Sequence, residues 1–226
     1  MENLKYKVIF SSRRTLSICI SPDNGIVVRA PHRTSEKKIE QFVSEKVGWI
    51  RKHVENNSRL IRLNQGKRYI DGETHLFMGK ENVLRINPSQ QIYVSHYDNI
   101  IEAGVNGAAS NMIKSLLDNW YMQKAREIFP EKTDEILRKF SSYYFSPSRL
   151  VVRSLRSRWG SCTSEGKITL SSELIKLDEV FLEYVIIHEL CHLKYHHHGK
   201  DYYRLLKELF PNYKAVRKEL RRYITA

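Results

Sequence analysis

Short runs in which hydrophobic and polar residues alternate occupy much of the first half of the chain, a pattern typical of β-strands. The runs at 6–10, 15–20 and 25–30 are separated by turn-forming residues, among them the stretch 22–25. Because the three runs follow one another closely, they predict a β-meander. Further strands are predicted at 68–78, 82–86, 91–94 and 100–103, with turns at 79–80 and 87–89.

Helical spacing of apolar residues appears once in this half and dominates after Ala108. Ser35 is expected to cap a helix that ends near 56–58, with an apolar face of Ile39, Phe42, Val43, Val47, Trp49 and Ile50. A long helix is predicted from Ala108 to near Pro130, because proline ends most helices. The remaining elements are predicted as a helix at 134–140, strands at 150–155 and 167–170, a helix capped by Asp178, and two amphipathic helices at 202–210 and 213–223.

This order of elements predicts an α+β fold with a β-rich first part and a more helical second part that carries a small sheet. The composition changes near 104–107, so a domain boundary is expected there. Residues 1–106 would form a β-rich region with one helix, and residues 107–226 the second domain. The alternative is one continuous fold in which the early strands pack directly on the later helices.

The strongly apolar helix after Asp178 carries the pattern His-Glu-x-x-His at His188, Glu189 and His192. Residues four apart lie on one face of a helix, so both imidazoles can reach one metal ion. Zinc accepts imidazole ligands and can keep a position open for water, from which Glu189 can take a proton. The structural alternative is a pair of core histidines with Glu189 as an ion-pair partner.

A catalytic zinc site needs a third protein ligand, and the triplet at 196–198 follows closely. His196 lies eight residues from His188 along the same helix face, too far along to close a compact tetrahedron. His198 precedes Gly199, which can turn the backbone so that this side chain folds back over the metal. His198 is therefore the favoured third ligand and His197 the second choice.

Four segments together carry a family resemblance. They are Arg-Trp-Gly-Ser-Cys at 158–162, Lys-Ile-Thr-Leu at 167–170, the His-Glu-Leu-Cys-His helix and His-Gly-Lys-Asp-Tyr at 198–202. In these segments the chain resembles the YgjP-like metallopeptidase family, which is related to the SprT-like and WLM zinc proteases. The resemblance implies a zincin-like domain over 107–226 that cleaves peptides or proteins. It also implies that His188, His192 and His198 bind Zn²⁺ and that Glu189 is the general base.

The segment 158–162 supplies further candidates. Arg158 is expected to stabilise developing negative charge or to anchor a substrate carboxylate. Gly160 suits a bulge or a close approach of the backbone. Cys162 is expected to be a small buried residue near the metal, the alternative being a fourth, inhibitory ligand.

The charge balance adds a second class of partner. The formal net charge of +13 favours nucleic acid or another acidic surface. The basic excess is spread over both halves of the chain, so binding to DNA, if present, is expected to be weak and non-specific. The rival functions are accordingly a DNA-associated SprT-like protease and a nucleic-acid-binding protein whose zinc is structural.

Cysteine usage and hydropathy bear on location. Three scattered cysteines suggest no disulfide framework, which favours a reducing compartment. No apolar run approaches the length of a membrane span, and residues 1–5 do not resemble a signal peptide. A cytoplasmic protein without a membrane partner is expected.

Overall fold

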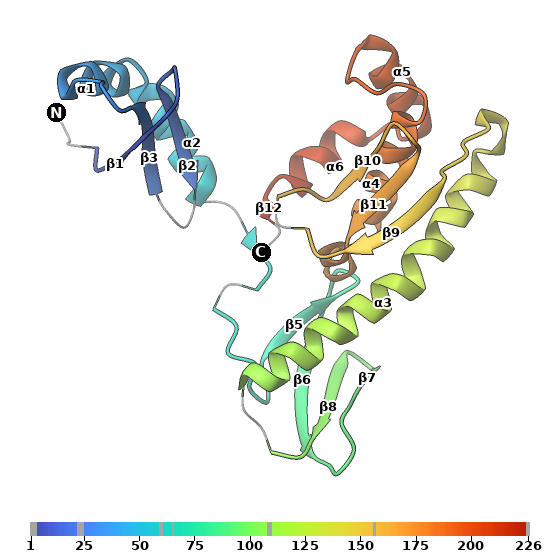
Figure 1. Cartoon of the computed structure of the whole chain (residues 1–226). Coiled ribbons are helices and arrows are strands. Elements are labelled where there is room, and N and C mark those ends of the chain that lie inside the picture. The colour runs from blue at the N-terminus through green and yellow to red at the C-terminus, as the bar shows by residue number, and fades with distance from the viewer. Residues whose placement is uncertain are drawn as a thin grey trace. The chain divides into compact units, whose positions relative to one another are not determined.

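The computed structural model divides the chain into two compact units, Met1–Leu60 and Ile61–Ala226 (Figure 1). It combines helices with several small sheets, which confirms the predicted α+β class. No helix in the described part of the chain is both long and apolar enough to cross a membrane. The described residues are 4–21, 25–58, 61–64, 66–107, 110–155 and 157–224, so most of the predicted turn at 22–25 lies outside them.

The first unit is built on a three-stranded sheet. Its strands are β1 (Lys7–Ser11), β2 (Ser17–Ser21) and β3 (Gly25–Pro31), in the order β1-β3-β2. β3 runs parallel to β1 and antiparallel to β2. The strands were predicted correctly, but the meander is wrong. β3 takes the centre because it is the strand with buried Val27, Val28 and Ala30.

Two helices complete this unit, α1 (Glu36–Glu45) and α2 (Val47–Ser58), where one helix was predicted. The break falls at Lys46. Ile39, Val43 and Ile50 share a small core with residues of β3. Trp49 does not join them and is 43% exposed, because neighbouring residues lie about 100° apart around a helix.

The second unit begins with a sheet that packs on a long helix. Phe77, Leu84 and Ile101 of this sheet share one core with Ile113 and Leu117 of the helix. The boundary expected near residue 106 therefore falls inside this unit, because the sheet and the helix after it bury their apolar faces against each other. The elements are β4 (Ile61–Arg62), β5 (Thr74–Phe77), β6 (Lys80–Pro88), β7 (Tyr93–Tyr97), β8 (Ile100–Val105) and α3 (Ser110–Lys139), with sheet order β5-β6-β8-β7.

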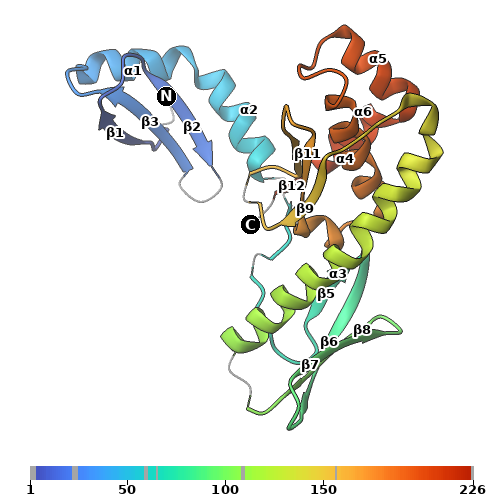
Figure 2. The same ribbon diagram turned by 45° about the vertical axis from the view of Figure 1, so that its right-hand side comes forward.

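Helix α3 is continuous through Pro130, so the prediction of two helices is wrong. Proline removes one backbone hydrogen bond, which usually ends or kinks a helix. Here the buried side chains of Phe129 and Ile136 stand on either side of it and belong to the same core. Tertiary packing thus outweighs the local cost. Figures 1 and 2 both show α3 running past the sheet of β5 to β8 and the sheet of β9 to β11, and it contacts β7, β9 and the helix that carries the histidines.

The second sheet and three helices follow α3. Strand order is β10-β11-β9, so β10 is an edge strand, and β9 and β11 are parallel. Asp178 caps α4, because its carboxylate accepts a hydrogen bond of 3.0 Å from the Val180 amide, as predicted. The elements are η1 (Ser141–Tyr143), β9 (Arg149–Arg153), β10 (Gly160–Cys162), β11 (Lys167–Ser171), η2 (Ser172–Lys176), α4 (Glu179–His192), α5 (Lys200–Leu209), α6 (Tyr213–Leu220) and β12 (Tyr223–Ile224), which pairs with β4.

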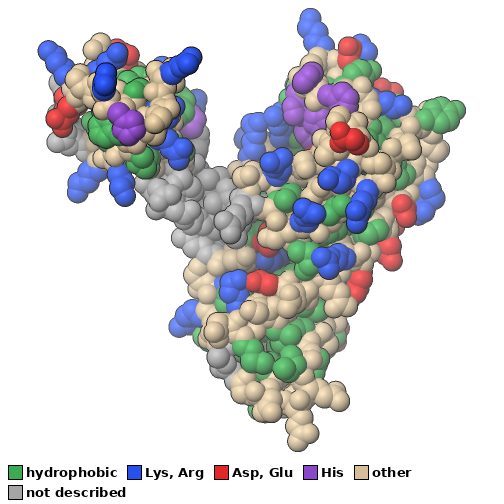
Figure 3. All heavy atoms as spheres, viewed as in Figure 1, with side chains coloured by type: hydrophobic (Ala, Val, Ile, Leu, Met, Phe, Trp, Pro, Cys, Tyr) green, Lys and Arg blue, Asp and Glu red, His purple; other side chains and the backbone are tan. Residues whose placement is uncertain are grey.

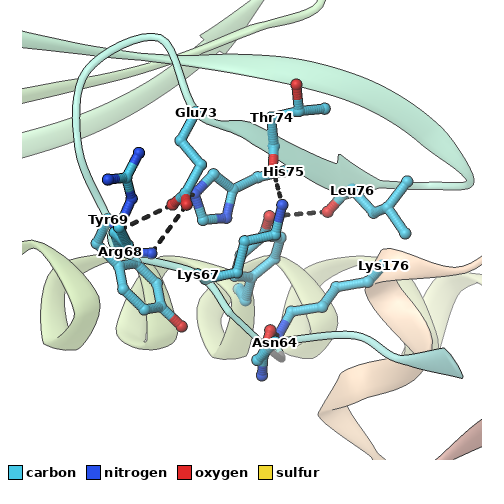
Figure 4. Close-up of polar contacts among 10 residues, drawn as sticks. Asn64, Lys67, Arg68, Tyr69, Glu73, Thr74, His75, Leu76 and Lys176 are labelled. Atoms are coloured by element: carbon cyan, nitrogen blue, oxygen red, sulfur yellow. Dashed lines mark hydrogen bonds and ion pairs between the residues drawn. The ribbon is translucent and has the colours of Figure 1, made fainter.

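A buried polar cluster joins the first sheet of this unit to the start of α4 (Figure 4). Lys176, at the end of η2, is 3% exposed. Its ammonium donates to Asn64 Oδ1 at 3.0 Å and to Glu173 Oε2 at 2.9 Å. On the strand side, the same ammonium lies 4.7 Å from the centre of the Tyr121 ring, and the Tyr121 hydroxyl donates to the Leu76 carbonyl of β5 at 2.7 Å. A buried lysine needs such partners, so this cluster fixes the entry of the chain into α4.

The turn between β5 and β6 contacts the end of η2, just before α4. The amides of Met78 and Gly79 donate to the carbonyls of Ile175 and Lys176 at 2.8 and 3.2 Å. Gly79 has φ +76°, and a Cβ on it would lie 2.8 Å from the Cα of Asp178. The helix cap and the turn are therefore in direct contact.

Replacing Gly79 with alanine should lower stability more than the same change at Gly72. Both glycines have positive φ, but a Cβ at Gly72 meets nothing within 4 Å. The two variants share a backbone cost of about 1–2 kcal/mol, and Gly79→Ala adds overpacking of about 1–3 kcal/mol. Urea unfolding of both variants measures the difference. Equal destabilisation would show that the turn does not press on the cap of α4.

Candidate metal centre

Three histidines converge at the C-terminal end of α4. His188 and His192 lie one turn apart on the helix, and His198 comes from the segment between α4 and α5. One ring nitrogen from each lies within 4.8 Å of the others. Within the described residues these three form the cluster of potential metal ligands, and His196 and His197 are exposed and outside it. The structure thus brings together the residues that spacing favoured.

The geometry of this cluster fits a zinc ion. The Nε2 atoms of His188 and His198 are 3.2 Å apart. Two nitrogens bound at about 2.0–2.1 Å in a tetrahedron stand about 3.3–3.4 Å apart. Two imidazole nitrogens that face each other this closely repel unless a proton or a cation lies between them. The donor set and its spacing therefore suit Zn²⁺.

Hydrogen bonds on the far side of two rings leave the Nε2 atoms free. Nδ1 of His192 donates to the carbonyl of Tyr195 at 3.1 Å. Nδ1 of His188 lies 2.7 Å from the hydroxyl of Tyr202, and that hydroxyl donates to the His188 carbonyl at 3.1 Å. The hydroxyl oxygen can therefore accept a hydrogen bond from the Nδ1–H group of His188. Metal-binding histidines typically have such partners, which fix the tautomer and the ring orientation.

The histidines are neutral at neutral pH, the form that binds metals. Burial, together with smaller effects of the neighbouring His192 and His198, lowers the pKa of His188 to about 3. Burial is also the largest cause of the lowered pKa values of His192 and His198. No proton has to be displaced from these rings before a cation binds.

Glu189 is a buried carboxyl group that forms no ion pair with another described residue. It is 4% exposed, and its Oε2 atom has no hydrogen-bond partner among the described residues. Burial raises the pKa of Glu189 to about 8, and the charge of Arg158 opposes this shift. A cation beside a carboxylate favours its charged form. An ion held by the histidines would therefore stabilise the group that now lacks a partner.

Strand β10 lies directly against Glu189. A Cβ on Gly160 would stand 2.6 Å from Oε1 of Glu189 and 2.9 Å from Cγ1 of Val185. The close backbone approach predicted for this glycine is confirmed. Cys162, on the same strand, is half-buried and lies outside the histidine cluster. Burial raises the pKa of Cys162 to about 11, with a smaller effect of Glu189.

A pocket of about 260 Å³ opens beside His188 and Glu189. Arg158 and Trp159 line this pocket. The structure therefore places Arg158, a residue that the sequence singled out, beside His188 and Glu189. Arg217 and Arg221 line it as well and were not predicted. Their spacing of four residues near the end of the last helix was the available signal. This spacing alone does not predict the pocket, because the sequence around Arg217 and Arg221 does not indicate which residues these side chains face.

The family model that describes the YgjP-like metallopeptidase domain matches residues 14–223 of this sequence. The chain belongs to the YgjP-like metallopeptidase family. The match covers most of both structural units, and it confirms the resemblance that the motif segments indicated. A metal-dependent peptidase is therefore the class of enzyme to which this protein belongs, and the histidine cluster is the place in its structure that suits the metal.

Two solved structures resemble part of this YgjP-like chain. One is the metallopeptidase zymogen abylysin of Pyrococcus abyssi, at 21% identity and a TM-score of 0.37, over 41% of this chain and 91% of that chain. The other is the zymogen jannalysin of Methanocaldococcus jannaschii, at 20% identity and a TM-score of 0.36, over 41% and 92%. Comparison with curated proteins gave no match.

Replacing Tyr202 with phenylalanine should weaken metal binding without unfolding the protein. The change removes the hydroxyl that holds His188, and loss of such a partner typically costs about 10–100-fold in metal affinity. Competition with a chromophoric chelator measures the affinity. Tyr195→Phe is the matched control, because Tyr195 contacts His192 through its backbone carbonyl. Equal affinities of the wild type and Tyr202→Phe would contradict a positioning role for the hydroxyl.

Proposed function

We propose that this protein is a zinc-dependent metallopeptidase in which His188, His192 and His198 bind Zn²⁺ and Glu189 is the general base. The observation that carries the proposal is the convergence of three imidazoles next to the buried Glu189 carboxyl group, whose Oε2 atom has no hydrogen-bond partner among the described residues. Family membership supports the class of reaction. The substrate is a peptide or a protein.

Each residue has a distinct task in peptide hydrolysis. When bound, zinc polarises the scissile carbonyl and brings the pKa of a water toward about 7. Glu189 takes a proton from the attacking water and passes it to the leaving amine. Burial raises the pKa of Glu189, and a cation held by the histidines would favour the carboxylate form that accepts the proton. Arg158 supplies positive charge on the same side of the pocket.

The edge of β10 offers a place for the substrate backbone. Among the described strands β10 pairs with β11 alone, so its other edge is free. An extended peptide can add to such an edge through backbone hydrogen bonds. Because Gly160 brings β10 against Glu189, a peptide bound there would lie beside the general base.

The rival functions receive less support. A structural zinc site usually has four protein ligands, often cysteines. The cluster has three ligands within the part of the chain that the structure describes, and Glu189 would have no task in a structural site. For nucleic acid, the support remains the net charge of +13. The proposed location is the cytoplasm, in keeping with three free cysteines.

Alanine at His188, His192 or His198 should each remove most of the bound zinc, while alanine at His196 or His197 should not. The first three supply converging nitrogens, and the other two lie outside the cluster. Metal analysis of the purified variants after dialysis measures occupancy. Retention of zinc by His198→Ala together with loss by His197→Ala would contradict the third ligand.

Glu189→Gln should keep fold and zinc but lower hydrolysis by about a hundredfold or more, the scale of a lost general base. The amide has the same shape and cannot accept the proton. Cleavage of a pooled peptide library by zinc-loaded wild type and variant, followed by mass spectrometry, measures the ratio. Equal cleavage by both proteins would contradict the mechanism.

A further inference from the structure

Arginines from two separate elements meet in the pocket beside the metal centre. Arg158 precedes β10, and Arg217 and Arg221 lie one turn apart on and just after α6. The pocket also contains His188 and Glu189, so the three cationic groups stand next to the groups proposed for catalysis. On the face drawn in Figure 3, Lys and Arg side chains lie directly beside the histidine group of the second unit.

These arginines have no acidic partner within the described residues. The contrast is Arg222, just after α6, which forms an ion pair with Glu219 and does not line the pocket. Arg217 is held in place by donating to the Tyr203 hydroxyl at 3.3 Å, a contact that leaves its charge uncompensated. Glu189 is the acidic residue among those that line the pocket, and its Oε2 atom has no hydrogen-bond partner among the described residues.

The guanidinium groups of Arg158, Arg217 and Arg221 line the same pocket as His188 and Glu189. A negatively charged group that entered the pocket would therefore meet several positive charges at once, in a partly enclosed space where such charges interact more strongly than in bulk water.

We propose that this pocket binds a carboxylate of the substrate next to the scissile bond, either an acidic side chain or the C-terminal carboxylate of the peptide. The proposal rests on the peptidase function proposed above and names the chemical class of substrate. Guanidinium groups match carboxylates through paired hydrogen bonds. The pocket volume of about 260 Å³ offers space for one side chain.

Three dipeptides test the proposal on the full-length, metal-free protein, in which neither turnover nor zinc affects binding. Acetyl-Ala-Glu-amide carries a side-chain carboxylate, acetyl-Ala-Ala carries a terminal one, and acetyl-Ala-Gln-amide carries none. Calorimetric titration measures each affinity. At least one carboxylate should bind about ten-fold or more tightly than the glutamine peptide. Which one does so decides between an acidic side chain and a C-terminus.

Variants then locate the binding. Arg217→Gln and Arg221→Gln should each remove most of this preference, and Arg217→Lys, which keeps the charge but not the paired hydrogen bonds, should fall between. Arg222→Gln is the matched control, because it removes the same charge near the end of α6 but outside the pocket. This variant should keep the preference for the carboxylate peptide. Thermal unfolding confirms that every variant is folded.

Two results would overturn the proposal. One is equal binding of all three dipeptides, and the other is an effect of Arg222→Gln as large as that of Arg217→Gln, which would indicate only general attraction. If no dipeptide binds, but a short DNA oligonucleotide binds the wild type and fails to bind Arg217→Gln, the pocket would be assigned to phosphate instead. Because the assay contains no zinc, its failure leaves the metal-binding and Glu189 results unaffected, so the two proposals fail separately.

Discussion

The structure depends on one constraint, the burial of ionisable groups on an apolar helix. α4 is surrounded by core residues, yet it carries His188, Glu189 and His192. Burial opposes the charged forms of these groups, and hydrogen bonds within the chain satisfy them only in part. The Tyr202 hydroxyl and the Tyr195 carbonyl occupy the outer ring nitrogens. Within the described residues, the inner nitrogens and the Oε2 atom of Glu189 remain without such partners, and a divalent cation would compensate this set.

Much of the second unit positions this helix. The cluster around Lys176 and the tight turn at Gly79 hold the segment that leads into α4, where Asp178 caps the first turn. The sheet of β9 to β11 brings Gly160 against Glu189. The sheet that precedes α3 therefore contacts the start of α4 through the helix cap, in addition to the core that it shares with α3.

Local pattern predicted most elements, whereas long-range packing decided what the pattern missed. The spacing of His188 and His192 and the glycine after His198 were sufficient to choose three residues that the structure brings together. The meander, the end of a helix at Pro130 and the boundary near residue 106 were wrong or misplaced, because each depends on what an element packs against. Arg217 and Arg221 were missed for the same reason, since nothing in their neighbourhood along the chain refers to the pocket that they line.

An open zinc site held by three histidines is the feature on which the proposed catalysis depends. X-ray absorption at the zinc edge of the purified, zinc-loaded protein measures the number and kind of ligands directly. Three imidazole nitrogens at about 2.0–2.1 Å and one further light atom from solvent are expected, with no sulfur. A sulfur ligand at about 2.3 Å, or a fourth imidazole that closes the site, would mean structural zinc and would contradict the catalytic assignment.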